Sequence, residues 1–253
     1  MSFILSLSKK LVWAGKEAVT SNSNKGIALR ADFHMHTYYS KDCTTSPQRL
    51  VDRCLKVGLG CIAVTDHNTI RGGVEVAAIA PFPVIVASEI KTTHGEITGL
   101  FLTEEVPRGL SPMETVERIK SQGGLVSIPH PFDKVRRSVI TDDALEEVLP
   151  HADIIEAFNA RNVFRGADER ARAAASTHGL VMTAVSDAHH ALELGRTYTE
   201  MPEFDGSSAG FLAALKDASL HPSPPPWWGQ VLMHGVTTFN KGLRRVAPWT
   251  RQG

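Results

Sequence analysis

The chain has 253 residues, of which 42% are hydrophobic, so it can bury a large core as a single domain of barrel size. Basic and acidic residues number 27 each, and the formal net charge is zero. No overall electrostatic field would therefore recruit nucleic acid or an anionic membrane, although a local basic pocket is compatible with this balance. The three cysteines lack metal-knuckle spacing, which favours a cytoplasmic location without structural disulfides.

Residues 1–29 form a predicted N-terminal extension, amphipathic at first and then polar. Charged residues interrupt its apolar part, which argues against a signal peptide. The longest apolar stretch, residues 76–87, is broken by Pro81 and Pro83 and is too short to cross a bilayer. We therefore expect no stable membrane association.

Between residues 30 and 221, short apolar segments alternate with segments of helical periodicity. Seven strands are predicted, at about 30–35, 61–65, 83–87, 96–102, 125–128, 153–158 and 181–185. Six helices are predicted, at about 46–58, 71–80, 111–123, 142–149, 167–178 and 208–220. Ser-Pro pairs at 46–47 and 111–112 are typical helix starts. This alternation predicts an α/β domain over residues 30–221, with a largely parallel sheet closed or nearly closed into a barrel.

Residues 222–253 begin with a Pro- and Trp-rich turn and continue as a predicted amphipathic helix over 231–246. Leu232, Val236 and Phe239 share one face of this helix with Leu243. We expect that apolar face to pack across the barrel or against a second subunit, giving a possible homo-oligomer. Contact with a membrane surface is a lesser alternative, because the cationic face is small.

Imidazole and carboxylate side chains recur at the carboxyl ends of the predicted strands. They are His34, His36, Asp66, His67, Glu89, His130, Asp187 and His189. Alternation along a strand places His34 and His36 on one face, and likewise Asp187 and His189. Because the carboxyl ends of barrel strands converge on one face, these residues predict a shared metal cluster.

The ordered motifs resemble those of the PHP (polymerase and histidinol phosphatase) family of metal-dependent phosphoesterases, over about residues 31–220. The motifs are His34-Met-His36-Thr37 with Tyr39-Ser40-x-Asp42, Thr65-Asp66-His67-Asn68, Glu89, Pro129-His130-Pro131 and Ser186-Asp187-Ala188-His189. The resemblance implies a distorted seven-stranded (β/α) barrel, similar to a TIM barrel. It also implies two or three divalent ions, for which zinc, manganese and iron all suit imidazole and carboxylate ligands.

The resemblance also implies which residues would hold each ion. The first would take His34, His36, Glu89 and Asp187; the second Glu89 and His130; the third Asp42, His67 and His189. Relatives often place another histidine on the second ion, in the strand after the bridging glutamate. Here Glu96 stands at that place, and His94 is a rival ligand.

Clustered divalent ions would activate a water molecule to attack phosphorus, so no side-chain nucleophile is needed. Candidate catalytic residues are Asp187 and His189, able to handle a proton, and Asp66, which we expect to orient a ligand. Arg161 and Arg136 (or its neighbour Arg137) are candidates for binding phosphate. His190 is a further candidate substrate contact, with a structural role about equally favoured.

These residues predict an enzyme that hydrolyses a small phosphorylated substrate such as a nucleotide, a sugar phosphate or an amino-alcohol phosphate. A nuclease acting on oligonucleotide ends would use the same site, although the neutral composition is mild evidence against it. A metal-binding regulatory module with little turnover is a non-enzymatic alternative. An amidohydrolase is disfavoured, because Glu89 stands where a modified lysine would be expected to bridge the metals.

Overall fold

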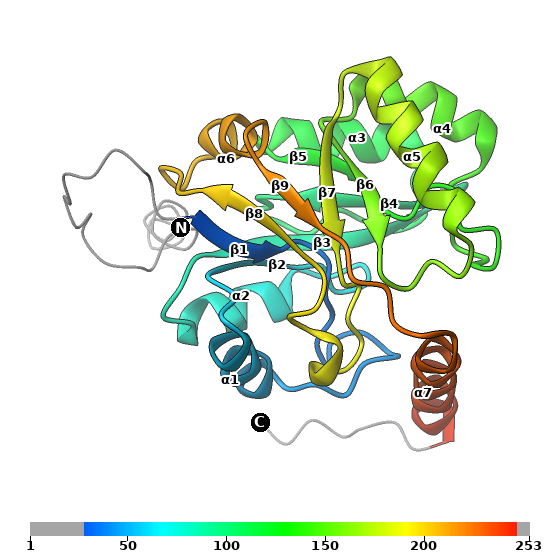
Figure 1. Cartoon of the computed structure of the whole chain (residues 1–253). Helices are drawn as coiled ribbons and strands as arrows, with labels where there is room; N and C mark the ends of the chain where they lie inside the picture. The colour runs from blue at the N-terminus through cyan, green and yellow to red at the C-terminus, as the bar shows by residue number, and fades with distance from the viewer. Residues whose placement is uncertain (1–27, 247–253) are drawn as a thin grey trace, which may run out of the picture.

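The computed structural model describes residues 28–246, whose core is one mixed sheet (Figure 1). Within that range the sheet has nine strands: β1 (Ala28–Asp32), β2 (Cys61–Val64), β3 (Val84–Thr92), β4 (Gly95–Leu100), β5 (Leu125–Ile128), β6 (Ile154–Asn159), β7 (Val181–Val185), β8 (Tyr198–Pro202) and β9 (Ser219–His221). Their spatial order is β7-β6-β5-β4-β3-β2-β1-β8-β9. Strands β1 to β3 pair in parallel, as do β5 to β7, and β4 joins the two groups by antiparallel pairing.

The sheet curls until its two halves meet, so that β7 lies beside β1 and β8. The backbone N–H of Ser186 donates to Asp32 Oδ1 at 3.1 Å, and the N–H of His36 donates to the carbonyl of Ala188 at 2.9 Å. Thr199 Oγ1 accepts from the Ala184 N–H across the same seam at 2.9 Å. The expected α/β, nearly closed barrel is confirmed.

The expected count of seven strands is wrong. All seven predicted strands are present within a few residues, but β8 and β9 are added at the end, as an antiparallel extension of β1. The predicted helix 208–220 is shorter than expected, because the chain leaves helical conformation after Leu215 and residues 219–221 pair with β8.

Seven α-helices occur between residues 28 and 246. They are α1 (Pro47–Val57), α2 (Arg71–Ile79), α3 (Pro112–Ser121), α4 (Asp142–Val148), α5 (Arg165–His178), α6 (Ser208–Leu215) and α7 (Trp227–Val246). Ser46 and Ser111 cap α1 and α3 as predicted, each accepting a hydrogen bond from the backbone three residues on. Gly58 ends α1 with a φ of 74°, a left-handed conformation that glycine adopts without strain.

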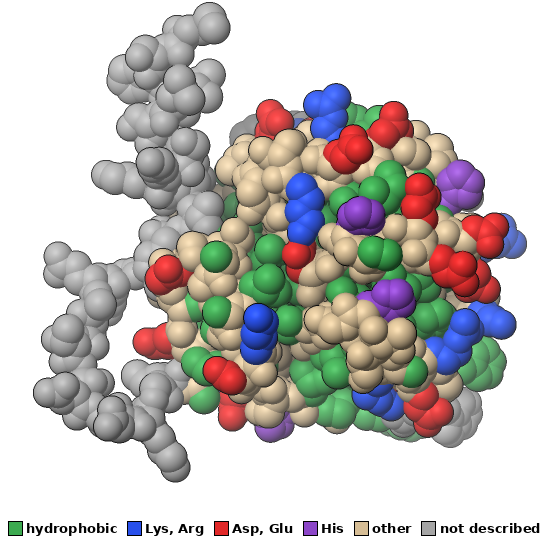
Figure 2. All heavy atoms as spheres, turned by 90° about the horizontal axis from the view of Figure 1, so that it is seen from above, with side chains coloured by type: hydrophobic (Ala, Val, Ile, Leu, Met, Phe, Trp, Pro, Cys, Tyr) green, Lys and Arg blue, Asp and Glu red, His purple; other side chains and the backbone are tan. Residues whose placement is uncertain are grey.

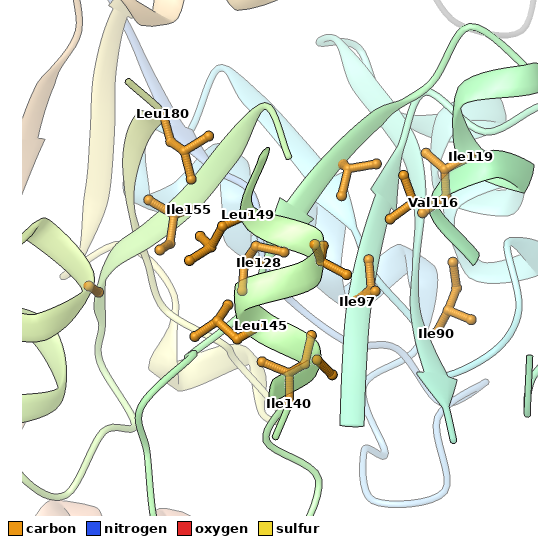
Figure 3. Close-up of a cluster of buried hydrophobic side chains, with 14 of the residues drawn as sticks. Ile90, Ile97, Val116, Ile119, Ile128, Ile140, Leu145, Leu149, Ile155 and Leu180 are labelled. Carbon is orange, nitrogen blue, oxygen red and sulfur yellow. The ribbon is translucent and has the colours of Figure 1, made fainter. Parts of the chain in front are cut away.

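The strands separate two apolar layers, because successive side chains point to opposite faces of the sheet. This alternation of side chains positions the site. Figure 3 shows one layer, in which Ile90, Ile97 and Ile128 pack against residues of α3 and α4. Along β3 the opposite face carries Ile85 and Ala87, which belong to the barrel interior. Glu89 follows on that inner face by the two-residue period of a strand, so its carboxylate enters the barrel at the end of an apolar row.

Helices α6 and α7 lie at opposite ends of the barrel (Figure 1). Phe211 of α6 is fully buried against Phe33 and Phe101, and so closes one end with apolar packing. The face seen from above in Figure 2, at the end away from α7, carries scattered acidic and basic side chains. None of the helices between residues 28 and 246 combines the length and hydrophobicity that crossing a bilayer requires.

The predicted orientation of the C-terminal helix is wrong in one respect. Val231, Leu232, Val236 and Phe239 are 38–65% exposed, so the apolar face does not pack across the barrel. The helix also begins earlier than predicted, inside the Pro/Trp-rich turn. Packing of this face against a second subunit stays a prediction. The predicted extension over residues 1–29 lies almost entirely outside the described residues.

Candidate metal centre

Every ligand predicted from the motifs reaches the mouth of the barrel at the end where α7 lies. His34 and His36 follow β1, His67 follows β2, and His130 follows β5. Glu89 and Glu96 come from the β3–β4 hairpin, Asp187 and His189 follow β7, and Asp42 lies in the loop before α1. All of them except His67 are buried. Burying so many imidazoles and carboxylates together is costly unless they share a cation.

The tightest group comprises four atoms from three strands. His34 Nε2 and His36 Nε2 are 3.2 Å apart, Glu89 Oε2 lies 3.6 Å from each, and Asp187 Oδ1 lies 3.5 and 3.6 Å from them. Four ligands bound tetrahedrally at zinc–nitrogen distances are separated from one another by about 3.4 Å. The group therefore has the size of a metal coordination sphere.

One buried carboxylate oxygen supports this interpretation. Asp187 Oδ1 is buried and accepts no hydrogen bond from the described residues. Buried acceptors are normally paired, and an unpaired one needs an explanation such as an ion. Asp187 Oδ1 is the oxygen that faces the two imidazoles, so the residues present fit a divalent metal.

A second group shares Glu89. Its Oε1 lies 2.9 Å from His130 Nε2, while its Oε2 belongs to the first group, so the carboxylate is placed to bridge two ions. Glu96 is buried with Oε1 3.9 Å from His67 Nδ1. The rival residue His94 is exposed in the hairpin turn and bonded to Thr93, which places Glu96 rather than His94 in the cluster.

The third group centres on Asp42. Its Oδ2 lies 3.3 Å from His67 Nε2 and 3.5 Å from His189 Nε2. Burial would raise the pKa of Asp42, but the hydrogen bonds and charges of His189 and His67 outweigh it, and the pKa is lowered. The carboxylate is thus ionised and available to a cation.

The imidazoles differ in charge because their surroundings differ. Burial, together with His189 and His67, lowers the pKa of His36 to about 3, so its lone pair is free for a metal. The pKa of His34 is raised despite burial, because Asp187, Glu156 and Glu89 surround it. Burial and the nearby Glu89 raise the pKa of Glu96. The surplus of carboxylates makes the mouth attractive to divalent cations.

Glu156 is a site residue that the motifs did not reveal. Its Oε1 lies 2.5 Å from His34 Nδ1, and its Oε2 accepts from the His130 N–H at 2.9 Å and the Asn159 amide at 2.8 Å. A carboxylate on the outer nitrogen fixes the tautomer and orientation of a ligating imidazole. The only signal in the sequence was a glutamate within the otherwise apolar strand β6.

Asp66 lies behind the cluster. Its oxygens accept from the Thr37 N–H and hydroxyl and from Ser40 Oγ at 2.5–2.8 Å. Ser40 Oγ in turn lies 3.1 Å from His36 Nδ1. This chain matches the orienting function expected of Asp66 rather than direct contact with an ion or a substrate.

Two of the predicted ligands adopt strained backbone conformations. His130 and Asp187 have φ values of 31° and 53°, in the left-handed region that residues other than glycine rarely adopt. Each such residue costs on the order of 1 kcal/mol and persists where the surrounding structure fixes it, commonly at functional sites.

The predicted phosphate-binding residues lie in different settings. Arg136 lies beside the cluster, with Nη1 2.5 Å from Asp187 Oδ2 and Nε donating to Asp133 at 3.0 Å. Arg161 pairs with Glu193 at 3.1 Å and donates to α7. His190 caps a short 3-10 turn by accepting from the Leu192 N–H, and it does not line the cavity described next.

A cavity of about 410 Å³ opens over the cluster. Its lining includes the predicted ligands Asp42, Glu89 and Glu96 together with Arg136, Arg137 and Arg161. Helix α7 contributes His234, Thr237, Thr238 and Lys241. The volume is at the lower end of the range for small-molecule pockets. An anionic group could therefore reach the metal ligands and the arginines together.

Comparison with known proteins agrees with the motifs. The model of the PHP domain matches residues 32–128, and that of the PHP-associated region matches residues 166–220. The uncharacterized protein MJ1587 of Methanocaldococcus jannaschii is 41% identical over 145 residues, which is 52% of this chain and 82% of that protein. The chain belongs to the PHP family. The uncharacterized protein MJ0417 of the same organism is 34% identical over 198 residues, which is 74% of this chain and 79% of that protein.

Solved structures share the PHP fold at lower identity. A two-domain protein from Bacteroides vulgatus, described as containing a predicted PHP-like metal-dependent phosphoesterase, superposes with a TM-score of 0.61 at 19% identity, over 83% of this chain and 69% of that one. The lesion-specific endonuclease PfuEndoQ from Pyrococcus furiosus gives a TM-score of 0.53 at 13% identity, over 77% and 58%. At these identities the likeness concerns the fold alone.

Proposed function

We propose that this PHP protein is a metal-dependent phosphoesterase that hydrolyses a small phosphorylated substrate. The observation that carries the proposal is the buried cluster of His34, His36, Glu89 and Asp187 beside a cavity that Glu89 and Arg136 both line. A phosphate ester needs this combination, because its oxygens must be neutralised while water approaches phosphorus.

The bound ions would neutralise the phosphoryl oxygens and lower the pKa of the attacking water. Arg136 and Arg137 would hold phosphate oxygens on the cavity wall. Water then adds to phosphorus, the ester P–O bond breaks, and the proton lost by water passes to the leaving oxygen. Arg136 occupies Asp187 Oδ2 and helps to keep that carboxylate ionised, which leaves the neighbouring His189 as the candidate to take up that proton.

A small substrate is favoured over an oligonucleotide by the shape of the mouth. Helix α7 lies over the cavity and bonds to the loop after β6, through Arg161 and Asn162. A cavity of about 410 Å³ has room for a nucleotide or a sugar phosphate. A regulatory module without turnover would have little reason to retain a nearly complete ligand set.

The experiment is a screen of phosphomonoesters and phosphodiesters with added manganese, zinc or ferrous iron, under anaerobic conditions for iron. We expect metal-dependent release of phosphate or of the alcohol from a small ester, and its loss in His36→Ala. A single-stranded oligonucleotide with free ends is included in parallel. If no phosphate ester is hydrolysed although the protein binds metal, the proposal is wrong and the regulatory alternative is favoured. Hydrolysis of the oligonucleotide alone would favour the nuclease.

A further inference from the structure

Helix α7 binds the barrel through its polar face, the reverse of an ordinary amphipathic helix. Thr237 and Asn240 are only 8% and 6% exposed, whereas Phe239 between them is 65% exposed. Thr237 Oγ1 accepts from Arg161 at 2.6 Å, and the Asn240 amide donates to the backbone carbonyl of Asp42 at 3.2 Å. The orientation of the helix is therefore fixed by the loops that form the metal site.

This orientation brings Lys241 to the third group of ligands. Its Nζ lies 3.0 Å from Asp42 Oδ2, the oxygen that also faces His67 Nε2 and His189 Nε2. The lysine side chain is 54% exposed, so it reaches the carboxylate from the solvent side and lines the cavity. The ammonium thus lies on the oxygen that an ion held by Asp42, His67 and His189 would need.

A divalent ion and an ammonium cannot share this oxygen without strong repulsion, because both are positive and lie within a few ångströms of each other. We propose that Lys241 is an internal competitor for the third metal position, and that it makes this position weaker than the first. The inference rests on the metal centre assumed in the proposed function, but it concerns occupancy and not turnover.

The first group differs from the third in which carboxylate oxygen its nearest cation contacts. Its ligands are buried, and the cation nearest to it, Arg136, contacts Asp187 through Oδ2, leaving Oδ1 facing His34 and His36. In the first group the guanidinium therefore contacts one oxygen of Asp187, and the two imidazoles face the other. At Asp42 the competitor and the ligands converge on the same oxygen, while Oδ1 is buried without a hydrogen bond. Competition for the ligand oxygen therefore arises at the third position and not at the first.

The test measures bound metal directly. Wild type and Lys241→Met, which keeps the length of the side chain and removes its charge, are loaded with manganese or zinc and dialysed against a series of free-metal concentrations. Metal per chain is then measured by mass spectrometry. We expect the third position of the variant to fill at free-metal concentrations about fivefold lower than in wild type, the equivalent of one partly exposed ion pair, so that the two proteins differ by a fraction of one ion per chain at intermediate concentrations.

Two control variants make the result specific. Lys241→Arg keeps the positive charge and should bind metal as wild type does. Lys216→Met, an exposed lysine at the end of α6, should have no effect. Equal occupancy and affinity in Lys241→Met and wild type would overturn the inference, whether or not any ester is hydrolysed. Tighter metal binding without hydrolysis would instead sustain it and count against the proposed function alone.

Discussion

The two ends of the barrel are closed by helices with opposite surfaces. At one end α6 inserts Phe211, fully buried, among Phe33, Phe101 and Phe204. At the other end α7 turns Thr237 and Asn240 inward and leaves its large apolar side chains exposed. The end with α6 stabilises the fold, and the end with α7 carries the charged side chains that we predict to bind metal. The same separation of stability and activity is general in (β/α) barrels.

The largest expected effect comes from removing the apolar plug. Phe211→Ala should lower the free energy of unfolding by about 3–5 kcal/mol, because a fully buried phenylalanine leaves a cavity. Phe239→Ala is the same substitution on α7, where the ring is 65% exposed, and should change stability by less than about 0.5 kcal/mol. Denaturant unfolding of the two variants gives the comparison.

If Phe211→Ala does not fold, Phe211→Leu retains most of the apolar volume and should show a smaller loss of the same sign. Equal losses at Phe211 and Phe239 would mean that α7 also stabilises the fold through its apolar face. That result would point to a second subunit covering that face.

The metal end should stabilise the protein only when it is loaded. Manganese or zinc at about one hundred times its dissociation constant should raise the free energy of unfolding by about 2.7 kcal/mol, and a chelator should reverse the effect. Asp187→Asn removes the charge of an unpaired oxygen in the first group, so its melting temperature should respond much less to metal. A full response in that variant would place the ion elsewhere.

The next largest effect should come from Glu156, whose carboxylate holds the imidazole of His34. Glu156→Gln keeps the shape of the side chain but weakens its hold on His34 Nδ1, and should reduce metal affinity about 10- to 100-fold. Metal titration measures the loss of affinity, and the far-ultraviolet circular dichroism spectrum should be unchanged. Glu146→Gln, an exposed position on α4, is the matched control. An unchanged affinity would show that Glu156 only stabilises β6.

The sequence predicts the barrel class and the convergence of ligands because both depend on local patterns. Apolar periodicity marks the seven strands, and the rule that active sites lie at carboxyl strand ends brings Glu89, His130 and Asp187 together. Glu156 escaped because it belongs to none of the motifs, although a glutamate between apolar strand residues was a signal. Strand β8 escaped because its residues, Tyr-Thr-Glu-Met-Pro, include a charge and a proline, and β9 has only three residues.

The orientation of α7 could not be predicted, for a general physical reason. Periodicity shows which residues share a face, but not which face meets the rest of the protein. Here hydrogen bonds to Arg161 and to the Asp42 loop decide the orientation, and they involve partners about 75 and 200 residues away. If α7 had buried its apolar face, as amphipathic helices usually do, Lys241 would lie away from the metal centre.

A pH-dependent effect is expected at the seam where β7 meets β1, where Asp32 Oδ1 accepts from the Ser186 N–H. Burial raises the pKa of Asp32 to about 7, from its ordinary value of 3.8. Between these values the folded chain keeps a proton that the unfolded chain has lost, so stability falls as the pH rises, by at most about 1.4 kcal/mol per pH unit. Asp32→Asn cannot titrate and still offers an oxygen to Ser186. With a chelator present, unfolding free energies measured from pH 4 to 8 should therefore fall more steeply in wild type than in the variant, and parallel curves would show that Asp32 is already ionised in the folded barrel.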